Sequence, residues 1–222
     1  MPSAPLPKVR AELVQVSRRL HQNGWVANHD GNVSVRLTGD RFLITPTAVS
    51  KGSVDDGMLL VVDAAGKVLE GRRKPFGELD LHLAIYRGRP EVDAVVHAHP
   101  PYATALGLTG QQLSPIALPE MVVSLGNTVP TLPRAMPKDA AQNAALEKAA
   151  GLYDAALLQG NGVFSWGPSL ELALLRHELV EHCAKILHLA KAFGPVPPLG
   201  TAEEQKLLEA RAKAGLGPKP RK

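Results

Sequence analysis

The chain has one cysteine, few aromatic residues and no long apolar run, and each shortage excludes a class of protein. Because Cys183 is the single cysteine, an internal disulfide is excluded and a reducing, cytoplasmic location is expected. No run of about 18 apolar residues occurs, and the first residues lack the apolar core of a signal peptide, so we expect no membrane partner. Aromatic residues make up only 4 %, so Leu, Val and Ala must fill most of the core.

The 222 residues carry a net charge of +4 that is concentrated at one end. From Glu203 onward six Lys and Arg accompany three Glu, whereas the rest of the chain is nearly neutral. A basic end on a neutral body is not the charged face that nucleic acid requires, so we expect no nucleic-acid partner. We assign residues 1–202 to a single domain and residues 203–222 to a C-terminal helix with a basic, disordered tail.

Hydrophobic periodicity predicts hairpins early in the chain and strands alternating with helices later. GNVSVRLTGDRFLITPT and MLLVVDAAGKVLEG are predicted hairpins, residues 92–97 a buried strand, and DAALLQGNGVFSWG two further strands. Helical spacing and end signals predict helices over residues 8–22, 78–88, 102–108, 139–150, 169–193 and 202–214. Residues 110–137, with five prolines, are predicted to be loop-rich. This order favours an α/β fold with a mixed or antiparallel sheet covered by helices.

Two histidines, His97 and His99, follow one another at the end of the predicted strand over residues 92–97. Because residues i and i+2 of a strand point to the same face, both imidazoles can converge on one cation. His-x-His is a reasonable metal pair, but two ligands alone do not make a site. The structural alternative is a pair of histidines that are hydrogen-bonded at a helix entrance.

Glu78 lies in KPFGELDLH, at the predicted start of a helix. A carboxylate there complements the helix dipole, but with two histidines it also gives the composition of a hydrolytic zinc site or a facial iron triad. His82 follows four residues later on the same helix face and could orient or shield the glutamate. The Gly-Asn turn of GNVS, residues 31–34, offers backbone N–H groups and an amide to an anion.

Taken in order, these segments resemble the class II aldolase and adducin head-domain family, from about Val9 to about Leu208. The resemblance rests on GNVSVRL, FLITPTAVSKG, GMLLVVD and LLQGNGVFSWGPSLELAL, and above all on KPFGELDLHLAIYRGRPEVDAVVHAHPPYATAL. It implies a three-layer α/β/α sandwich with a mainly antiparallel central sheet. It also implies a small-molecule substrate and a homotetramer with active sites at subunit interfaces.

The enzymes of this family are aldolases, epimerases and decarboxylases that hold a divalent metal, usually zinc, on three histidines. The resemblance implies that His97 and His99 are two of these ligands and that Glu78 moves protons. The epimerases have aspartate there, so carbon–carbon cleavage or decarboxylation is favoured. The implied function is a metal-dependent lyase that acts on a hydroxy-carbonyl or sugar-derived substrate through a metal-stabilised enediolate. The implied substrate-binding residues are Asn32, Thr47, Gly77, His29 and Arg134.

The chain departs from the family at two places. Asn161, in QGNG, stands where the family has its third histidine, and Phe76-Gly77 replaces two serines that grip phosphate. An amide is a poor zinc ligand, so Glu78, Asn161 or a water could complete the site, with manganese, iron or magnesium competing with zinc. The site could also be empty. Without the two serines the substrate need not be phosphorylated.

Two functions of other classes stay open. The family contains adducin heads, which are cytoskeletal binding modules without the metal site, and a missing third histidine is compatible with such a role. An iron-dependent oxygenase with two histidines and one carboxylate is the other alternative. The joint presence of Glu78, His97 and His99 favours the lyase, because a binding module has no need of all three.

Overall fold

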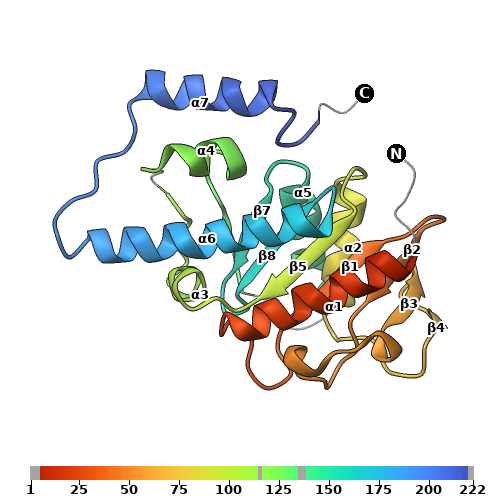
Figure 1. Cartoon of the computed structure of the whole chain (residues 1–222). Helices are drawn as coiled ribbons and strands as arrows, with labels where there is room; N and C mark the ends of the chain where they lie inside the picture. Colours follow the sequence, from red (N-terminus) through yellow and green to blue (C-terminus); the bar gives the residue numbers. More distant parts are fainter. Residues whose placement is uncertain (1–5, 115–116, 135–138, 220–222) are drawn as a thin grey trace.

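The computed structural model describes residues 6–114, 117–134 and 139–219, and its centre is one eight-stranded sheet (Figure 1). The strands are β1 (Asn32–Arg36), β2 (Arg41–Ile44), β3 (Leu60–Asp63), β4 (Val68–Glu70), β5 (Ala94–Ala98), β6 (Thr131–Leu132), β7 (Ala155–Leu158) and β8 (Val163–Gly167). Their order in the sheet is β4-β3-β2-β1-β5-β8-β7-β6. Neighbouring strands are antiparallel except β6 and β7, which confirms the mainly antiparallel sheet.

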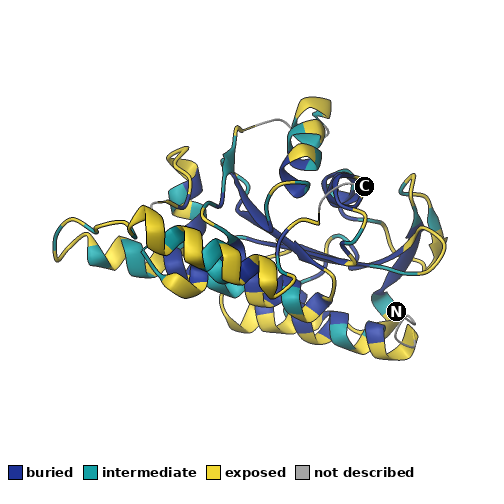
Figure 2. Ribbon diagram, turned by 90° about the horizontal axis from the view of Figure 1, so that it is seen from above, coloured by how far each residue is buried: buried dark blue, intermediate teal, exposed yellow. Residues whose placement is uncertain are grey.

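Helices cover both faces of this sheet, so the expected three layers are present (Figures 1 and 2). The α-helices are α1 (Leu6–Gln22), α2 (Leu79–Gly88), α3 (Pro101–Leu108), α4 (Pro119–Leu125), α5 (Ala140–Ala150), α6 (Leu170–Ala190) and α7 (Thr201–Lys213), and Lys51–Ser53 and Asp56–Met58 form short 3-10 turns. Helices α1 and α6 pack on one face with the apolar residues of β1, and α2 and α5 pack on the other. In the described part of the chain, no helix is both long and apolar enough to cross a membrane.

Strand β1 shows how the sequence sets the two faces. Val33 and Val35 belong to the apolar cluster that includes α1, while the alternate residues Asn32, Ser34 and Arg36 point to the α2 side. This alternation follows from the two-residue period of a strand. The polar residues of β1 are therefore turned toward one helix.

The described part of residues 110–137 is loop-rich, as predicted, but it also contains α4 and β6, which were not predicted. Pro119 begins α4 and Gly126, with φ 94°, ends it. Proline at a first turn and glycine just past a last turn are helix signals, but the surrounding prolines obscured them. Residues 115–116 and 135–138 of this stretch lie outside the described residues.

Helix α7 is tied to the rest of the fold by a buried carboxylate. Asp154 is fully buried and forms ion pairs with Arg89, Arg176 and Arg211. Arg211 projects from α7 and also donates to the carbonyl of Val123 on α4, at 2.8 Å. This contact fixes α7 over α4, where Figure 1 shows it. The boundary between residues 202 and 203 stays a prediction.

Candidate functional site

The candidate site lies at the ends of the central strands β1, β5 and β8, where distant segments of the chain meet. Antiparallel pairing places Asn32 of β1 and Phe164 of β8 directly opposite His97 of β5. Directly opposite residues of neighbouring strands point to the same face, so these three side chains lie in a row. The start of α2 and the turn between β7 and β8 complete the site, since they bring Glu78 and Asn161 to these strand ends.

The structure brings all the predicted site residues together. A cavity of about 270 Å³ is lined by seven of them, namely His29, Asn32, Thr47, Gly77, Glu78, His99 and Asn161. A second cavity of about 580 Å³ shares Gly77, Glu78 and Asn161 with the first and is also lined by Arg134. His97 lies beside Glu78. The roles assigned to these residues stay predictions.

His97 is fixed with one ring nitrogen facing Glu78. Its ring stacks on Phe164 at 4.0 Å between centroids, and its Nδ1 lies 2.9 Å from the carbonyl oxygen of Val163. Because a carbonyl only accepts, Nδ1 carries the hydrogen and Nε2 keeps a lone pair in the neutral ring. This Nε2 is buried, has no hydrogen-bond partner in the described chain, and lies 3.3 Å from Oε2 of Glu78.

His99 offers a second buried nitrogen. Its ring centroid is 5.0 Å from that of His97, its Nδ1 lies 3.6 Å from Oδ2 of Asp30, and its Nε2 has no hydrogen-bond partner among the described residues. Burial, and then the nearby His97, lower the pKa of His99. A lowered pKa favours neutral imidazole, which is the form that binds metals.

Glu78 is held at both oxygens by amides. Nδ2 of Asn32 donates to Oε2 at 2.8 Å, and Nδ2 of Asn161 donates to Oε1 at 2.6 Å. Burial acts to raise the pKa of Glu78, but the protonated form of His97 and the two amides outweigh it and hold the pKa well below its ordinary value. Glu78 occupies the N-cap position of α2 without a side-chain capping hydrogen bond, so the carboxylate serves the cavity and not the helix end.

The described residues fit a divalent cation only in part. No three His, Cys, Asp or Glu side chains within the described ranges are grouped so as to hold a metal. Two unpartnered imidazole nitrogens are present, however, and Asn161 commits its Nδ2 to Glu78, which leaves its Oδ1 as a hard donor. This donor set fits one divalent ion on His97 and His99, with oxygen atoms in the remaining positions.

Sequence reasoning missed two residues that support the cavity. Asp30 faces His99, and its position two residues before Asn32 in the same turn was the available signal. Lys51 is 1 % exposed, and its Nζ donates to the carbonyls of His29 and Val49, which joins two cavity loops. Burial lowers the pKa of Lys51 to about 8, against the opposing influence of Asp30 and Glu78.

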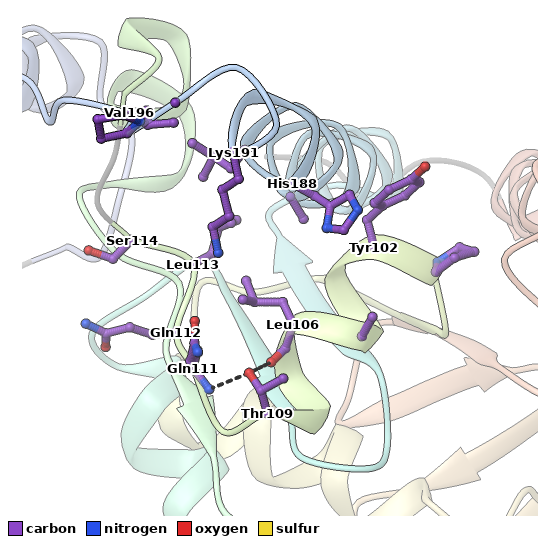
Figure 3. Close-up of a pocket in the computed structure, with 16 residues that line it drawn as sticks. Tyr102, Leu106, Thr109, Gln111, Gln112, Leu113, Ser114, His188, Lys191 and Val196 are labelled. Atoms are coloured by element: carbon purple, nitrogen blue, oxygen red, sulfur yellow. Dashed lines mark hydrogen bonds between the residues drawn. The ribbon is translucent and has the colours of Figure 1, made fainter.

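A larger cavity, of about 920 Å³, lies away from these residues, between α3, residues 111–114 and the end of α6 (Figure 3). Tyr102, His188 and Lys191 line it together with apolar side chains such as Leu106. Figure 3 shows Lys191 extending from the end of α6 into this space. The cavity contains none of the predicted site residues.

Comparisons with known proteins show the family to which the chain belongs. Residues 11–188 match the family described as Class II Aldolase and Adducin N-terminal domain. The chain is 35 % identical to the 3-oxo-tetronate 4-phosphate decarboxylase of Pectobacterium atrosepticum, over 82 % of this chain and 84 % of that protein. It is 31 % identical to the L-fuculose phosphate aldolase of Methanococcus vannielii, over 82 % of this chain and 97 % of that protein.

Solved structures give the same result. An L-fuculose 1-phosphate aldolase superposes with a TM-score of 0.82 at 30 % identity, covering 93 % of this chain and 96 % of that one. YgbL from Escherichia coli superposes with a TM-score of 0.83 at 32 % identity, covering 90 % of this chain and 98 % of that one. The chain therefore belongs to the class II aldolase and adducin family.

Proposed function

We propose that the protein is a metal-dependent lyase that cleaves a carbon–carbon bond, by retro-aldol cleavage or decarboxylation, in a hydroxy-carbonyl or sugar-derived substrate. The observation that carries the proposal is that Glu78 lies 3.3 Å from Nε2 of His97 and lines one cavity with His99, while neither histidine's Nε2 has a hydrogen-bond partner among the described residues. Relatives named as aldolases and as a decarboxylase support it.

His97 and His99 would hold the ion, with Oδ1 of Asn161, Glu78 or water in the remaining positions. Zinc is the ion that the family suggests, and the amide at Asn161 also favours manganese or iron. When bound, such an ion supplies Lewis acidity toward a substrate carbonyl.

Glu78 is the proposed acid and base. Its lowered pKa keeps the carboxylate ionised at neutral pH, which is the form that accepts a proton from the substrate. Both oxygens are held by amides, so the carboxylate has one orientation at the junction of the two cavities.

The two cavities suggest a substrate that spans them. Arg134 is exposed in the cavity of about 580 Å³. A guanidinium there would bind a carboxylate or phosphate of the substrate through two parallel hydrogen bonds. Thr47 and His29 line the opposite cavity, and Phe76 adds an apolar wall to it. A side-chain atom added at Gly77 would meet nothing within 4 Å, so the substrate has open space there.

We also propose a homotetramer, as the family suggests. Phe193 is 93 % exposed and Leu189 is 49 % exposed, beside the cavity of about 920 Å³ at the end of α6. Large exposed apolar side chains beside a hollow are typical of contact surfaces between proteins. Light scattering coupled to size-exclusion chromatography measures the state. A cytoplasmic location, expected from the sequence, stays a prediction.

The test begins with metal analysis of protein purified without chelator. Turnover is then measured on 3-oxo-tetronate 4-phosphate and L-fuculose 1-phosphate, and on their dephosphorylated forms, for the wild type, Glu78→Gln and His97→Ala. We expect one divalent ion per chain, loss of the ion in His97→Ala, and a roughly 10²–10⁴-fold loss of turnover in Glu78→Gln with the ion retained.

The alternatives give different results. A chain without stoichiometric metal, on which His97→Ala has no effect, would be a non-catalytic module of the adducin type. Bound iron together with oxygen uptake would identify an oxygenase.

A further inference from the structure

Polar side chains of β1 face polar side chains of α2, and each residue of one series lies opposite one residue of the other. The set, which we call the polar ladder, comprises Asn32, Ser34 and Arg36 on β1 and Glu78, His82 and Tyr86 on or at the start of α2. Two residues of a strand advance about 6.7 Å and four residues of a helix about 6 Å, so the two series stay matched over three pairs. Four of the six residues, Asn32, Ser34, His82 and Tyr86, are at most 3 % exposed.

A continuous chain of hydrogen bonds runs through the polar ladder to Glu78. The Tyr86 hydroxyl lies 2.8 Å from Oγ of Ser34, which lies 2.7 Å from Nδ1 of His82. Nε2 of His82 lies 2.6 Å from Oδ1 of Asn32, whose Nδ2 lies 2.8 Å from Oε2 of Glu78. His82 and Glu78 are thus both hydrogen-bonded to the side-chain amide of Asn32.

The chemistry of these groups assigns every hydrogen in the chain. The Glu78 carboxylate only accepts, so Asn32 must turn its NH₂ toward it and its carbonyl toward His82. That carbonyl also only accepts, so Nε2 of His82 carries the ring hydrogen and Nδ1 accepts from Ser34. Ser34 then accepts from Tyr86. Burial keeps His82 neutral, since it lowers the pKa of His82 to about 3.

We propose that His82 is a positioning residue for Glu78, because it holds the Asn32 amide in the one orientation that presents NH₂ to the carboxylate. Reversal of the amide would place a carbonyl oxygen against the Glu78 carboxylate. Loss of His82 would leave Asn32 free to reverse, and it would also leave the Ser34 hydroxyl without its acceptor. The inference rests on the proposed role of Glu78 as acid and base.

The first experiment compares kcat and KM of His82→Leu, His82→Gln and His177→Leu with the wild type. We expect His82→Leu to lower kcat about 10–100-fold with little change in KM, as is typical for residues that support a site from behind. The side-chain amide of glutamine both donates and accepts, so His82→Gln should recover most of the lost kcat. His177 is the matched control, because it is equally buried and bonded to a strand serine, Ser165, outside the polar ladder.

The second experiment needs no substrate and no variant. Nitrogen NMR of wild-type protein labelled with ¹⁵N-histidine should show His82 as a neutral ring with its hydrogen on Nε2 at pH 7. A hydrogen on Nδ1, or a charged ring, would overturn the inference.

The two proposals fail separately. If Glu78→Gln is inactive but His82→Leu turns over like the wild type, the positioning role is wrong while the lyase function stands. If Glu78→Gln keeps full turnover, the proposed function fails, and the role of His82 in it falls as well. If His177→Leu lost as much kcat as His82→Leu, the loss would come from disruption of the buried core, and the positioning role would be wrong.

Discussion

Gly162 lies so close to His99 that no side chain fits between them. A Cβ atom placed on Gly162 would lie 2.5 Å from the carbonyl oxygen of Ala98 and would overlap the His99 ring. Its φ of 68° is also one that glycine adopts without cost. The turn between β7 and β8 therefore sets how closely Asn161 approaches the histidine pair.

Gly162→Ala should displace His99 and weaken metal binding by about tenfold or more, as expected when a ligand loses its support. Zinc titration calorimetry measures the affinity, and urea unfolding measures stability. Gly24→Ala is the control, because Gly24 has a φ of 70° but nothing within 4 Å of an added Cβ. Both variants carry the left-handed backbone strain of about 1–2 kcal/mol. Equal zinc affinity in the two proteins would contradict the role of the close contact.

Asn161→His should raise zinc affinity, because a third imidazole replaces a weak amide donor next to His97 and His99. Zinc and manganese titrations of the wild type and the variant check this, with zinc expected to gain the more. Gln159→His places an imidazole in the same turn, where Gln159 instead bonds to the carbonyl of Leu108. A gain in zinc affinity from Gln159→His alone would show that the ion binds elsewhere.

The buried His177 should make the protein sensitive to acid. Ser165 donates to the carbonyl of Ala173, so Nδ1 of His177 donates to Ser165, and Nε2 is buried without a partner among the described residues. Burial lowers the pKa of His177 to about 3. In the unfolded chain the pKa of this histidine is about 6.5, so at lower pH the unfolded chain binds a proton that the folded chain does not bind. The free energy of unfolding should fall by about 1.4 kcal/mol per pH unit between pH 6 and 4 from this residue.

Urea unfolding at several pH values measures that slope in the wild type and in His177→Asn, whose amide keeps the donor to Ser165 but does not titrate. The variant should lose about 1.4 kcal/mol per pH unit of the acid slope. An identical slope in both proteins would mean that His177 titrates alike in the folded and unfolded chain.

Asp154→Asn should destabilise the fold by about 3–5 kcal/mol, because three buried guanidinium groups then lose their shared carboxylate. Guanidinium chloride is a salt and would screen these ion pairs, so urea, which is uncharged, is the suitable denaturant. Asp40→Asn, whose side chain is 79 % exposed, is the control and should change stability by less than about 1 kcal/mol. If Asp154→Asn unfolds at the same urea concentration as the control, the buried ion pairs do not hold α7.

The sequence predicted the structure well where a single hydrophobic periodicity or a short local motif determines it. The alternation around Val33 and Val35 predicted the hairpin, and His-x-His predicted that His97 and His99 would share a face. Contacts between distant segments were not predictable in this way. Ser34 looks like any outward polar residue of a strand, and only the packing of α2 turns it into a partner of His82. The pairing of Asp154 with Arg211, 57 residues later, has no local signal either.

The register of β1 against β5 has a practical consequence for anyone refolding this protein. Asn32 and His97 are direct partners, and a slip by one residue would send Asn32 to the opposite face of the sheet. A chain trapped in the wrong register could then be compact and helical and still be unable to assemble the site. The amount of divalent metal bound would then measure the fraction of molecules with the correct register. Circular dichroism would not distinguish these molecules from the misfolded ones.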